Sequence, residues 1–153
     1  VTARMDAPYI KVHKQERELT VMLLVDVSAS GSFGSGDRFK REVAAEAAAI
    51  LAYTAIKSND RVGLLMFSDK VELYIPAKKG SSHVWRVISE ILSFEPEGHA
   101  TDIKCALDLL GKVARRRAVV FVISDFIDQG YQEALKVAAR RHDLTGLLVS
   151  DPR

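Results

Sequence analysis

Residues 21–31 read Val21-Met-Leu-Leu-Val-Asp-Val-Ser-Ala-Ser-Gly31, and this stretch is the most informative in the chain. It opens with an uninterrupted apolar run, long enough for one buried strand, and ends in an Asp-x-Ser-x-Ser pattern. Strands buried on both faces of a parallel sheet read as continuous apolar runs, and open α/β sheets bind ligands at the carboxyl ends of such strands. The pattern therefore predicts an oxygen-rich site at the tip of a buried parallel strand.

Two later segments supply matching oxygens. Residues 118–124 form a second apolar run that Asp125 follows directly, and residues 97–103 form a loop with Thr101 at the start of a predicted helix. Asp and Ser also cluster in ordinary turns, so one such pattern alone is weak evidence. Side chains from three loops at successive strand ends are much more specific. The candidate ligands are Asp26, Ser28, Ser30, Thr101 and Asp125.

This set, in its order and approximate spacing, resembles the metal-ion-dependent adhesion site of von Willebrand factor A domains. Residues 60–69, the run of arginines at 115–117 and the terminal Asp-Pro-Arg look like one bacterial branch of that superfamily, domain of unknown function 58. The resemblance covers nearly the whole chain. Members of that family have further chain on both sides, so we expect this sequence to be part of a longer protein.

The resemblance implies that Ser28 and Ser30 bind a divalent cation directly. Asp26 and Asp125 would act largely through bound water and by orienting the hydroxyls, and Thr101 would bind directly or through water. Oxygen ligands suit hard cations, so we expect Mg²⁺, with Mn²⁺ or Ca²⁺ also possible. With few anionic ligands the metal keeps positive charge, and it can recruit an Asp or Glu side chain of a partner protein.

The resemblance therefore implies a non-enzymatic protein-interaction module. Its relatives are commonly encoded beside MoxR-type AAA+ ATPases, so we expect an adaptor that acts with such an ATPase. Two further residues are secondary candidates. Asp102 could cap the helix that follows it or support the site, and His99 could bind a softer metal or be an ordinary loop histidine.

The alternative function is Mg²⁺-dependent phosphoryl transfer, with Asp26 as the phosphoacceptor. Haloacid-dehalogenase-like phosphatases place a second Asp two residues later, where this chain has Ser28, and a receiver domain would want a Lys after a late strand. The glycine-rich residues 31–36 match no phosphate-binding motif. A third interpretation is purely structural: the hydroxyls cap helices and turns, and both aspartates are solvated.

The alternation of apolar runs and helical patterns predicts an α/β, Rossmann-like three-layer sandwich with helices on both faces. The central sheet is mostly parallel, with one antiparallel edge strand from Val71 to Ile75 that ends at Pro76. We place strand 19–25 between strands 61–67 and 118–124, and expect the lead-in at 1–18 and the domain at 19–153. The other predicted elements are a strand at 144–149 and helices at 38–57, 83–92, 102–114 and 131–141. The sheet-facing side of the first helix is predicted to be Phe39, Val43, Ala47, Ile50 and Thr54.

Composition narrows the partners. The net charge of +2 gives no reason to expect nucleic acid, and the basic clusters lie at predicted helix ends, where they complement the helix dipole. No apolar run reaches the length of about 18 residues that a membrane span needs, so we expect no membrane contact from this sequence and a cytoplasmic location. The one cysteine, Cys105, is predicted to be a packed thiol and no nucleophile.

Overall fold

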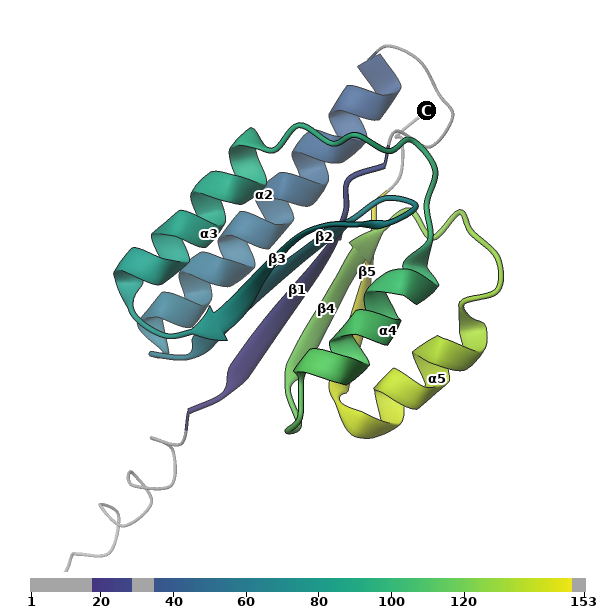
Figure 1. Ribbon diagram of the computed structural model, residues 1–153. Coiled ribbons are helices and arrows are strands. Elements are labelled where there is room, and N and C mark those ends of the chain that lie inside the picture. The colour runs from purple at the N-terminus through teal and green to yellow at the C-terminus, as the bar shows by residue number, and fades with distance from the viewer. Residues whose placement is uncertain (1–17, 29–34, 150–153) are drawn as a thin grey trace, which may run out of the picture.

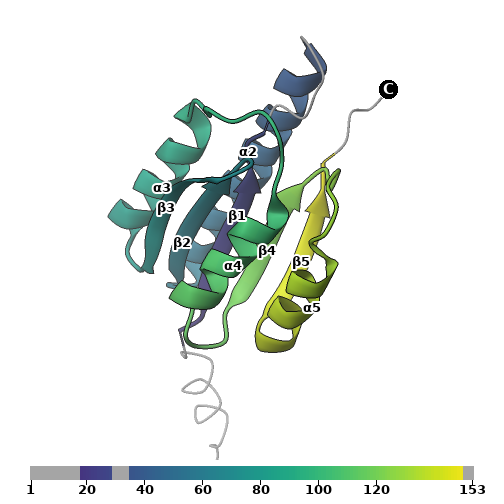
Figure 2. The same cartoon turned by 45° about the vertical axis from the view of Figure 1, so that its right-hand side comes forward.

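A five-stranded sheet lies between two layers of helices in the computed structural model, which describes residues 18–28 and 35–149 (Figures 1 and 2). The strands are β1 (Thr20–Asp26), β2 (Arg61–Phe67), β3 (Val71–Lys78), β4 (Val119–Ser124) and β5 (Asp143–Leu148). The helices are α2 (Ser35–Lys57), α3 (Ser81–Ser93), α4 (Ile103–Val113) and α5 (Gln132–Arg141). Helices α2 and α3 cover one face of the sheet, and α4 and α5 cover the other.

The strand order is β3-β2-β1-β4-β5, with β1 in the centre. β1 pairs in parallel with β2 and with β4, β4 pairs in parallel with β5, and only β3 runs antiparallel to its neighbour. This confirms the predicted three-layer α/β fold and the central place of the first strand. It also brings the carboxyl ends of β1 and β4 side by side, at the point where the chain changes the direction in which it adds strands.

Successive residues of β1 belong to opposite halves of the core. Leu23 lies in a cluster with Ala48 of α2 and Val87 of α3, while Leu24 lies in a cluster with Leu110 of α4. Both leucines have no exposed surface. Because the side chains of a strand alternate between its two faces, one uninterrupted apolar run fills both halves.

Helix α2 faces the sheet with small residues, which corrects one prediction. Its buried positions are Ala44, Ala48, Ala52 and Ala55, whereas Ile50 is 61% exposed. Of the predicted face, Val43 and Ala47 are partly buried and pack against the core, whereas Ile50 and Thr54 are exposed. The side chain of Phe39 lies outside the described part of the chain. The prediction followed the large apolar side chains. Alanines are small, so a helix that faces the sheet with them can pack close to it. The side that packs most closely is therefore the side that is buried. The helix also begins at Ser35, three residues earlier than predicted.

Strand β3 continues past Pro76 to Lys78, whereas the sequence predicted its end at Ile75. The pairing with β2 shifts register between Val62 and Leu64, so Pro76 lies beside a bulge of an edge strand, where a missing N–H does little harm. Gly63 of β2 allows this close approach, because a Cβ there would lie 2.6 Å from the Met22 sulfur and 3.1 Å from the Ile75 carbonyl oxygen.

Strand β2 has the predicted bounds, and the remaining elements differ from the predicted ones by at most two residues at either end. Helix α4 begins at Ile103 with Asp102 as its N-cap, and β5 begins at Asp143. Of the predicted lead-in, only Glu18 belongs to the described residues, so the division into lead-in and domain stays a prediction. No helix within residues 18–28 and 35–149 combines the length and apolar character needed to cross a membrane.

Candidate functional site

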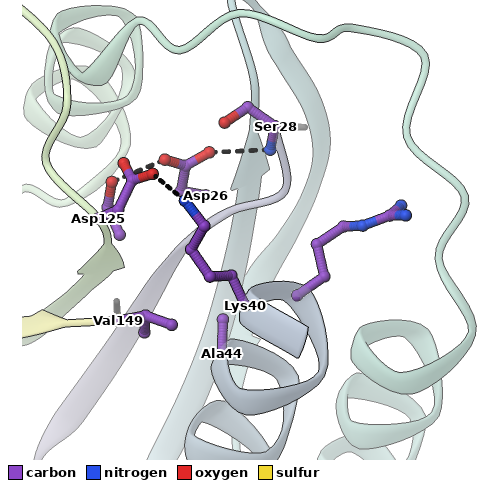
Figure 3. A pocket seen from close by; sticks show the side chains of 8 residues that line it. Asp26, Ser28, Lys40, Ala44, Asp125 and Val149 are labelled. Carbon is purple, nitrogen blue, oxygen red and sulfur yellow. Dashed lines mark hydrogen bonds and ion pairs between the residues drawn. The ribbon is translucent and has the colours of Figure 1, made fainter. Parts of the chain in front are cut away.

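The candidate site is a small pocket at the carboxyl ends of β1 and β4, seen from close by in Figure 3. Asp26 is the last residue of β1, and Asp125 directly follows β4. Helix α2 closes the pocket on one side. The lining residues are Asp26, Ser28, Lys40, Arg41, Ala44, Ser124, Asp125 and Val149.

Both carboxylate oxygens of Asp26 accept hydrogen bonds. The backbone N–H of Ser28 donates to Oδ1 at 2.8 Å, and the Ser124 hydroxyl donates to Oδ2 at 2.6 Å. The Thr101 hydroxyl makes a longer contact with Oδ2, at 3.4 Å. Since Asp26 is only 8% exposed, these contacts replace water around the carboxylate and fix its orientation.

The hydroxyls of Ser28 and Thr101 meet above Asp26. Their oxygens lie 2.5 Å apart, although the two residues are separated by 73 positions in the sequence. One follows β1 and the other precedes α4, so the contact joins loops from two different parts of the fold. The structure thus brings together the hydroxyl oxygens that the sequence predicted to share a site.

Asp125 faces the same pocket and forms an ion pair with a residue that the sequence analysis did not select. Lys40 of α2 reaches across, and its Nζ lies 3.2 Å from Asp125 Oδ2 (Figure 3). Both side chains are largely buried, with 17% of Lys40 and 8% of Asp125 exposed. The other carboxylate oxygen of Asp125 accepts the backbone N–H of Ile127 at 3.0 Å. The charged residues that line the pocket are therefore Asp26, Asp125, Lys40 and Arg41.

Burial raises the pKa of Asp26 above its ordinary value, because a charged carboxylate loses solvation in this pocket. Hydrogen bonds from Ser124 and Ser28 act in the opposite direction, and the nearby negative charge of Asp125 raises the pKa further. The net upward shift means that the folded protein disfavours the ionised form of Asp26. Added positive charge in the pocket would favour it.

The loop that carries Thr101 is held by Glu72 of β3 and by Ser68 in the turn between β2 and β3. The Glu72 carboxylate accepts the backbone N–H groups of Glu97 at 2.8 Å and Gly98 at 2.9 Å, and it also accepts the Ser68 hydroxyl. Partial burial acts to raise the pKa of Glu72, but these hydrogen bonds outweigh it and leave the pKa below its ordinary value.

Two further contacts fasten the same loop. The N–H of Asp102 donates to the carbonyl oxygen of Ser68 at 2.7 Å. A side chain at position 98 has no room, since a Cβ on Gly98 would lie 2.3 Å from the Ser68 Oγ. The loop must therefore pass close over the turn, and this passage fixes the backbone next to Thr101.

Not every predicted residue takes part in the pocket. Ser30 lies outside the described residues. The Asp102 side chain accepts the N–H of Cys105 at 3.2 Å and caps α4, which is one of the two roles considered for it. His99 is exposed on the loop, and no described hydrogen bond or ion pair connects it to the pocket. Asp26, Ser28, Thr101 and Asp125 thus form the described part of the predicted set.

Lys40 and Ser124 are the residues that sequence reasoning missed. Lys40 stands four residues before Ala44 and eight before Ala48, so it continues the buried stripe of α2. Ser124 is a hydroxyl at the end of an otherwise apolar strand. A basic residue in line with a buried alanine stripe, and a polar residue closing a buried strand, are the signals that could have identified them.

The thiol of Cys105 donates to the backbone oxygen of Asp102 at 3.0 Å, and burial raises its pKa to about 11. The nucleophile of a thiol is its thiolate, so this shift supports the prediction of a packed, unreactive cysteine.

The donor set of the pocket fits a hard divalent cation. Its oxygens belong to carboxylates and hydroxyls, which are ligands that Mg²⁺ accepts. Adjacent ligands of an octahedral Mg²⁺ are separated by about 2.9 Å, from metal–oxygen distances of about 2.0–2.1 Å. The Ser28 and Thr101 oxygens are in hydrogen-bond contact, so two hydroxyls from different loops are adjacent as neighbouring ligands of one ion would be. No cluster of three or more His, Cys, Asp or Glu side chains suited to a metal occurs among the described residues.

The full chain, residues 1–153, matches the model of a family described as protein of unknown function DUF58. An uncharacterized protein of Mycobacterium bovis is 33% identical over 156 residues, which cover 100% of this chain and 49% of that protein. The chain thus spans about half the length of the curated relatives that it matches.

Two solved structures share the fold at low sequence identity. A conserved hypothetical protein, BatB, from Bacteroides thetaiotaomicron superposes with a TM-score of 0.68 at 21% identity, over 85% of this chain and 66% of that one. A von Willebrand factor type A structure from Catenulispora acidiphila gives a TM-score of 0.61 at 13% identity, over 84% of this chain and 32% of that one. The chain belongs to the family described as protein of unknown function DUF58, and its domain has the fold of von Willebrand factor A domains.

Proposed function

We propose that this domain is a protein-interaction module that binds a divalent cation, Mg²⁺ first, at the carboxyl ends of β1 and β4. The cation would recruit an Asp or Glu side chain of a partner protein. Ser28, Thr101 and the undescribed Ser30 would bind it through their hydroxyls. Asp26 and Asp125 would orient those hydroxyls and hold bound water. The chemistry that the metal supplies is a positively charged coordination position for an external carboxylate.

The observation that carries this proposal is the convergence of three side chains from different segments. The oxygens of Ser28 and Thr101 are in contact, and the carboxylate of Asp26 lies directly below them, within 3.4 Å of the Thr101 oxygen. Partly buried hydroxyls that only served the fold would more simply bond to nearby backbone groups. A cluster of oxygens in a pocket open at a strand end suits cation binding instead.

The surroundings of Asp26 argue against a nucleophilic role. A phosphoacceptor needs an oxygen that can approach phosphorus, but both oxygens of Asp26 accept hydrogen bonds and its side chain is nearly buried. Lys40 does provide an ammonium group in the pocket, as receiver-type chemistry would want, yet that group pairs with Asp125. We therefore propose a binding function with no enzymatic step.

The resemblance to bacterial von Willebrand factor A relatives makes a MoxR-type AAA+ ATPase the partner that we propose. The acidic residue would come from the ATPase or from a substrate presented to it. The domain would then act as an adaptor whose binding to that acidic residue depends on the metal. Because the chain spans about half of its curated relatives, the partner of the whole protein belongs to the same proposal.

Titration calorimetry with Mg²⁺ and with Mn²⁺ tests the metal site. Wild type should bind one ion weakly, and the Ser28→Ala/Ser30→Ala variant should lose that binding. A matched control is Ser89→Ala, which changes an exposed serine of α3. Equal binding in wild type and in the double variant would remove the site from consideration.

The partner is tested by affinity capture with the full-length protein in Mg²⁺ and in chelator. A metal-dependent partner should elute on chelation and should be lost with Thr101→Val, which keeps the side-chain shape without the hydroxyl. Incubation with acetyl phosphate and Mg²⁺ tests the enzymatic alternative. We expect no phosphate adduct, and an adduct that Asp26→Asn abolishes would overturn the non-enzymatic assignment.

A further inference from the structure

We propose that Lys40 is a built-in competitor of the divalent cation. Its ammonium group neutralises Asp125 when no metal is bound and must leave that carboxylate before the metal site can form. Lys40 would therefore weaken metal binding and make it depend on displacement of an internal ion pair. This inference rests on the proposed metal site and adds to it the residue that tunes its affinity.

The ammonium group of Lys40 lies next to a carboxylate that the proposed metal site would also use. Lys40 and Asp26 line the same pocket as Asp125, and the Lys40 Nζ lies 3.2 Å from Asp125 Oδ2 (Figure 3). Asp125 is the member of the predicted set that comes from β4, so the metal and the ammonium would share one carboxylate.

Burial makes this competition strong. Lys40 is 17% exposed and its partner carboxylate 8%, so solvent screens the pair less than it screens a surface ion pair. Removing one member of such a pair leaves the charge of the other less well compensated, which is costly. Without Lys40, the negative charge of Asp125 would disfavour the ionised form of Asp26 more strongly than it already does.

The backbone keeps Lys40 close to the site. The residue lies on the buried stripe of α2, in line with Ala44 and Ala48, and Ala44 lines the same pocket. A charge fixed to the fold acts at a high effective concentration, so it competes with a free ion even though each of its contacts is modest. Its long flexible stem also allows it to swing out toward solvent when a divalent ion arrives.

The test compares metal affinity in wild type, Lys40→Met and two controls. Lys40→Met keeps most of the length of the side chain and removes its charge, and we expect Mg²⁺ and Mn²⁺ to bind on the order of tenfold more tightly. Lys40→Arg keeps the charge and should bind like wild type. Lys57→Met removes the same charge at the other end of α2, about 25 Å away along the helix, and should also bind like wild type.

A double-mutant cycle gives a second readout that needs no metal titration. Melting temperatures of wild type, Lys40→Met, Asp125→Asn and the double variant, measured in chelator, should show a coupling between the two residues. The same cycle in saturating Mg²⁺ should show that coupling lost. An unchanged coupling in the presence of the metal would mean that Lys40 stays on Asp125, and the inference would be wrong.

The outcomes separate this inference from the proposed function. Suppose that Ser28→Ala/Ser30→Ala abolishes metal binding but Lys40→Met binds metal no more tightly than wild type. The proposed metal site is then supported and the proposed role of Lys40 is wrong. If neither wild type nor Lys40→Met binds metal at millimolar concentrations, both fall. If only Lys40→Met binds measurably, and Asp26→Ala in that background abolishes it, the competition by Lys40 is supported directly.

Discussion

The hydroxyl of Ser124 donates a 2.6 Å hydrogen bond to Oδ2 of Asp26, across the ends of two neighbouring strands and 98 residues of sequence. The hydroxyl oxygen of Ser124 also accepts the backbone N–H of Phe126 at 2.9 Å, and Phe126 has a left-handed φ of 57°. One hydroxyl therefore fixes the Asp26 carboxylate and the sharp turn that directly follows Asp125. The positions of the two carboxylates depend on each other through this residue.

Replacing Ser124 with alanine should therefore disturb both strand ends. A buried carboxylate oxygen and a backbone N–H would each lose a partner, so we expect a loss of about 1–3 kcal/mol in the free energy of unfolding. Metal binding should weaken as well, because Asp26 would be less well oriented. Urea denaturation and calorimetry measure the two effects. Ser93→Ala removes an exposed hydroxyl and is the control; a similar loss in both variants would contradict the role of Ser124.

Glu72→Gln should weaken metal binding although Glu72 is not a candidate ligand. The amide can accept with one oxygen only, so the N–H groups of Glu97 and Gly98 cannot both keep their partner, and the loop that carries Thr101 should loosen. We expect a loss of about tenfold in affinity, as is typical for residues that orient ligands. The control is Glu97→Gln, which removes only the exposed ion pair with Lys70. If Glu72→Gln binds metal as wild type does, the hydrogen bonds of Glu72 do not position Thr101.

Asp26→Asn should remove a pH-dependent loss of stability in chelator, although its single amide oxygen can keep only one of the two hydrogen bonds that the carboxylate accepts. The pKa of Asp26 is raised in the folded state, mainly by burial, so the stability that its protonated form contributes is complete below the unfolded pKa and is lost as the pH rises through the folded pKa. The asparagine stays neutral and escapes this loss. The difference in melting temperature between variant and wild type should therefore be largest near pH 7 and shrink on acidification. A difference that grows toward low pH would contradict the shift.

His142 should make the protein less stable in mild acid. Its side chain is buried, its Nδ1 accepts the backbone N–H of Ala118 at 3.0 Å, and burial together with the charges of Arg141 and Arg117 lowers its pKa. The folded state thus disfavours protonation. Stability should be complete above the unfolded pKa of about 6.5 and decline as the pH falls toward the folded value.

The variant His142→Asn isolates this effect, because its amide oxygen can accept the same N–H but carries no titratable group. Chemical denaturation at pH 7.5 and 5.5 should show a larger drop for wild type than for His142→Asn. Equal drops in the two proteins would assign the acid sensitivity to other groups.

The fold and the placement of four candidate site residues, Asp26, Ser28, Thr101 and Asp125, could be predicted because both follow from strand ends. An apolar run ending in Asp26, another ending before Asp125, and right-handed connections between parallel strands place the two aspartates at one edge. The two hydroxyls could be added because they lie in the loops at that edge. These features are local in sequence, and the topology brings them together without detailed packing.

Lys40 and Glu72 could not be predicted in the same way. Lys40 reaches the pocket because α2 packs with its alanines against the sheet, and that choice of face depends on how near two elements can approach. Glu72 acts on a loop that begins more than twenty residues later in the chain, folding back over the turn. Such contacts depend on the tertiary fold, and the periodicity of the sequence does not predict them.

Because Leu23 and Leu24 face opposite halves of the core, each position of β1 must face a particular side of the sheet. Deleting one residue within β1 would exchange the two leucines and turn Asp26 away from its partners, so the strand tolerates substitution far better than a change of length. In the loops that follow the strands, a change of length does not alter which face of the sheet a strand residue occupies. Relatives should therefore differ in length around the pocket while keeping the spacing inside β1, and natural variation can reshape what the site recognises without moving the site itself.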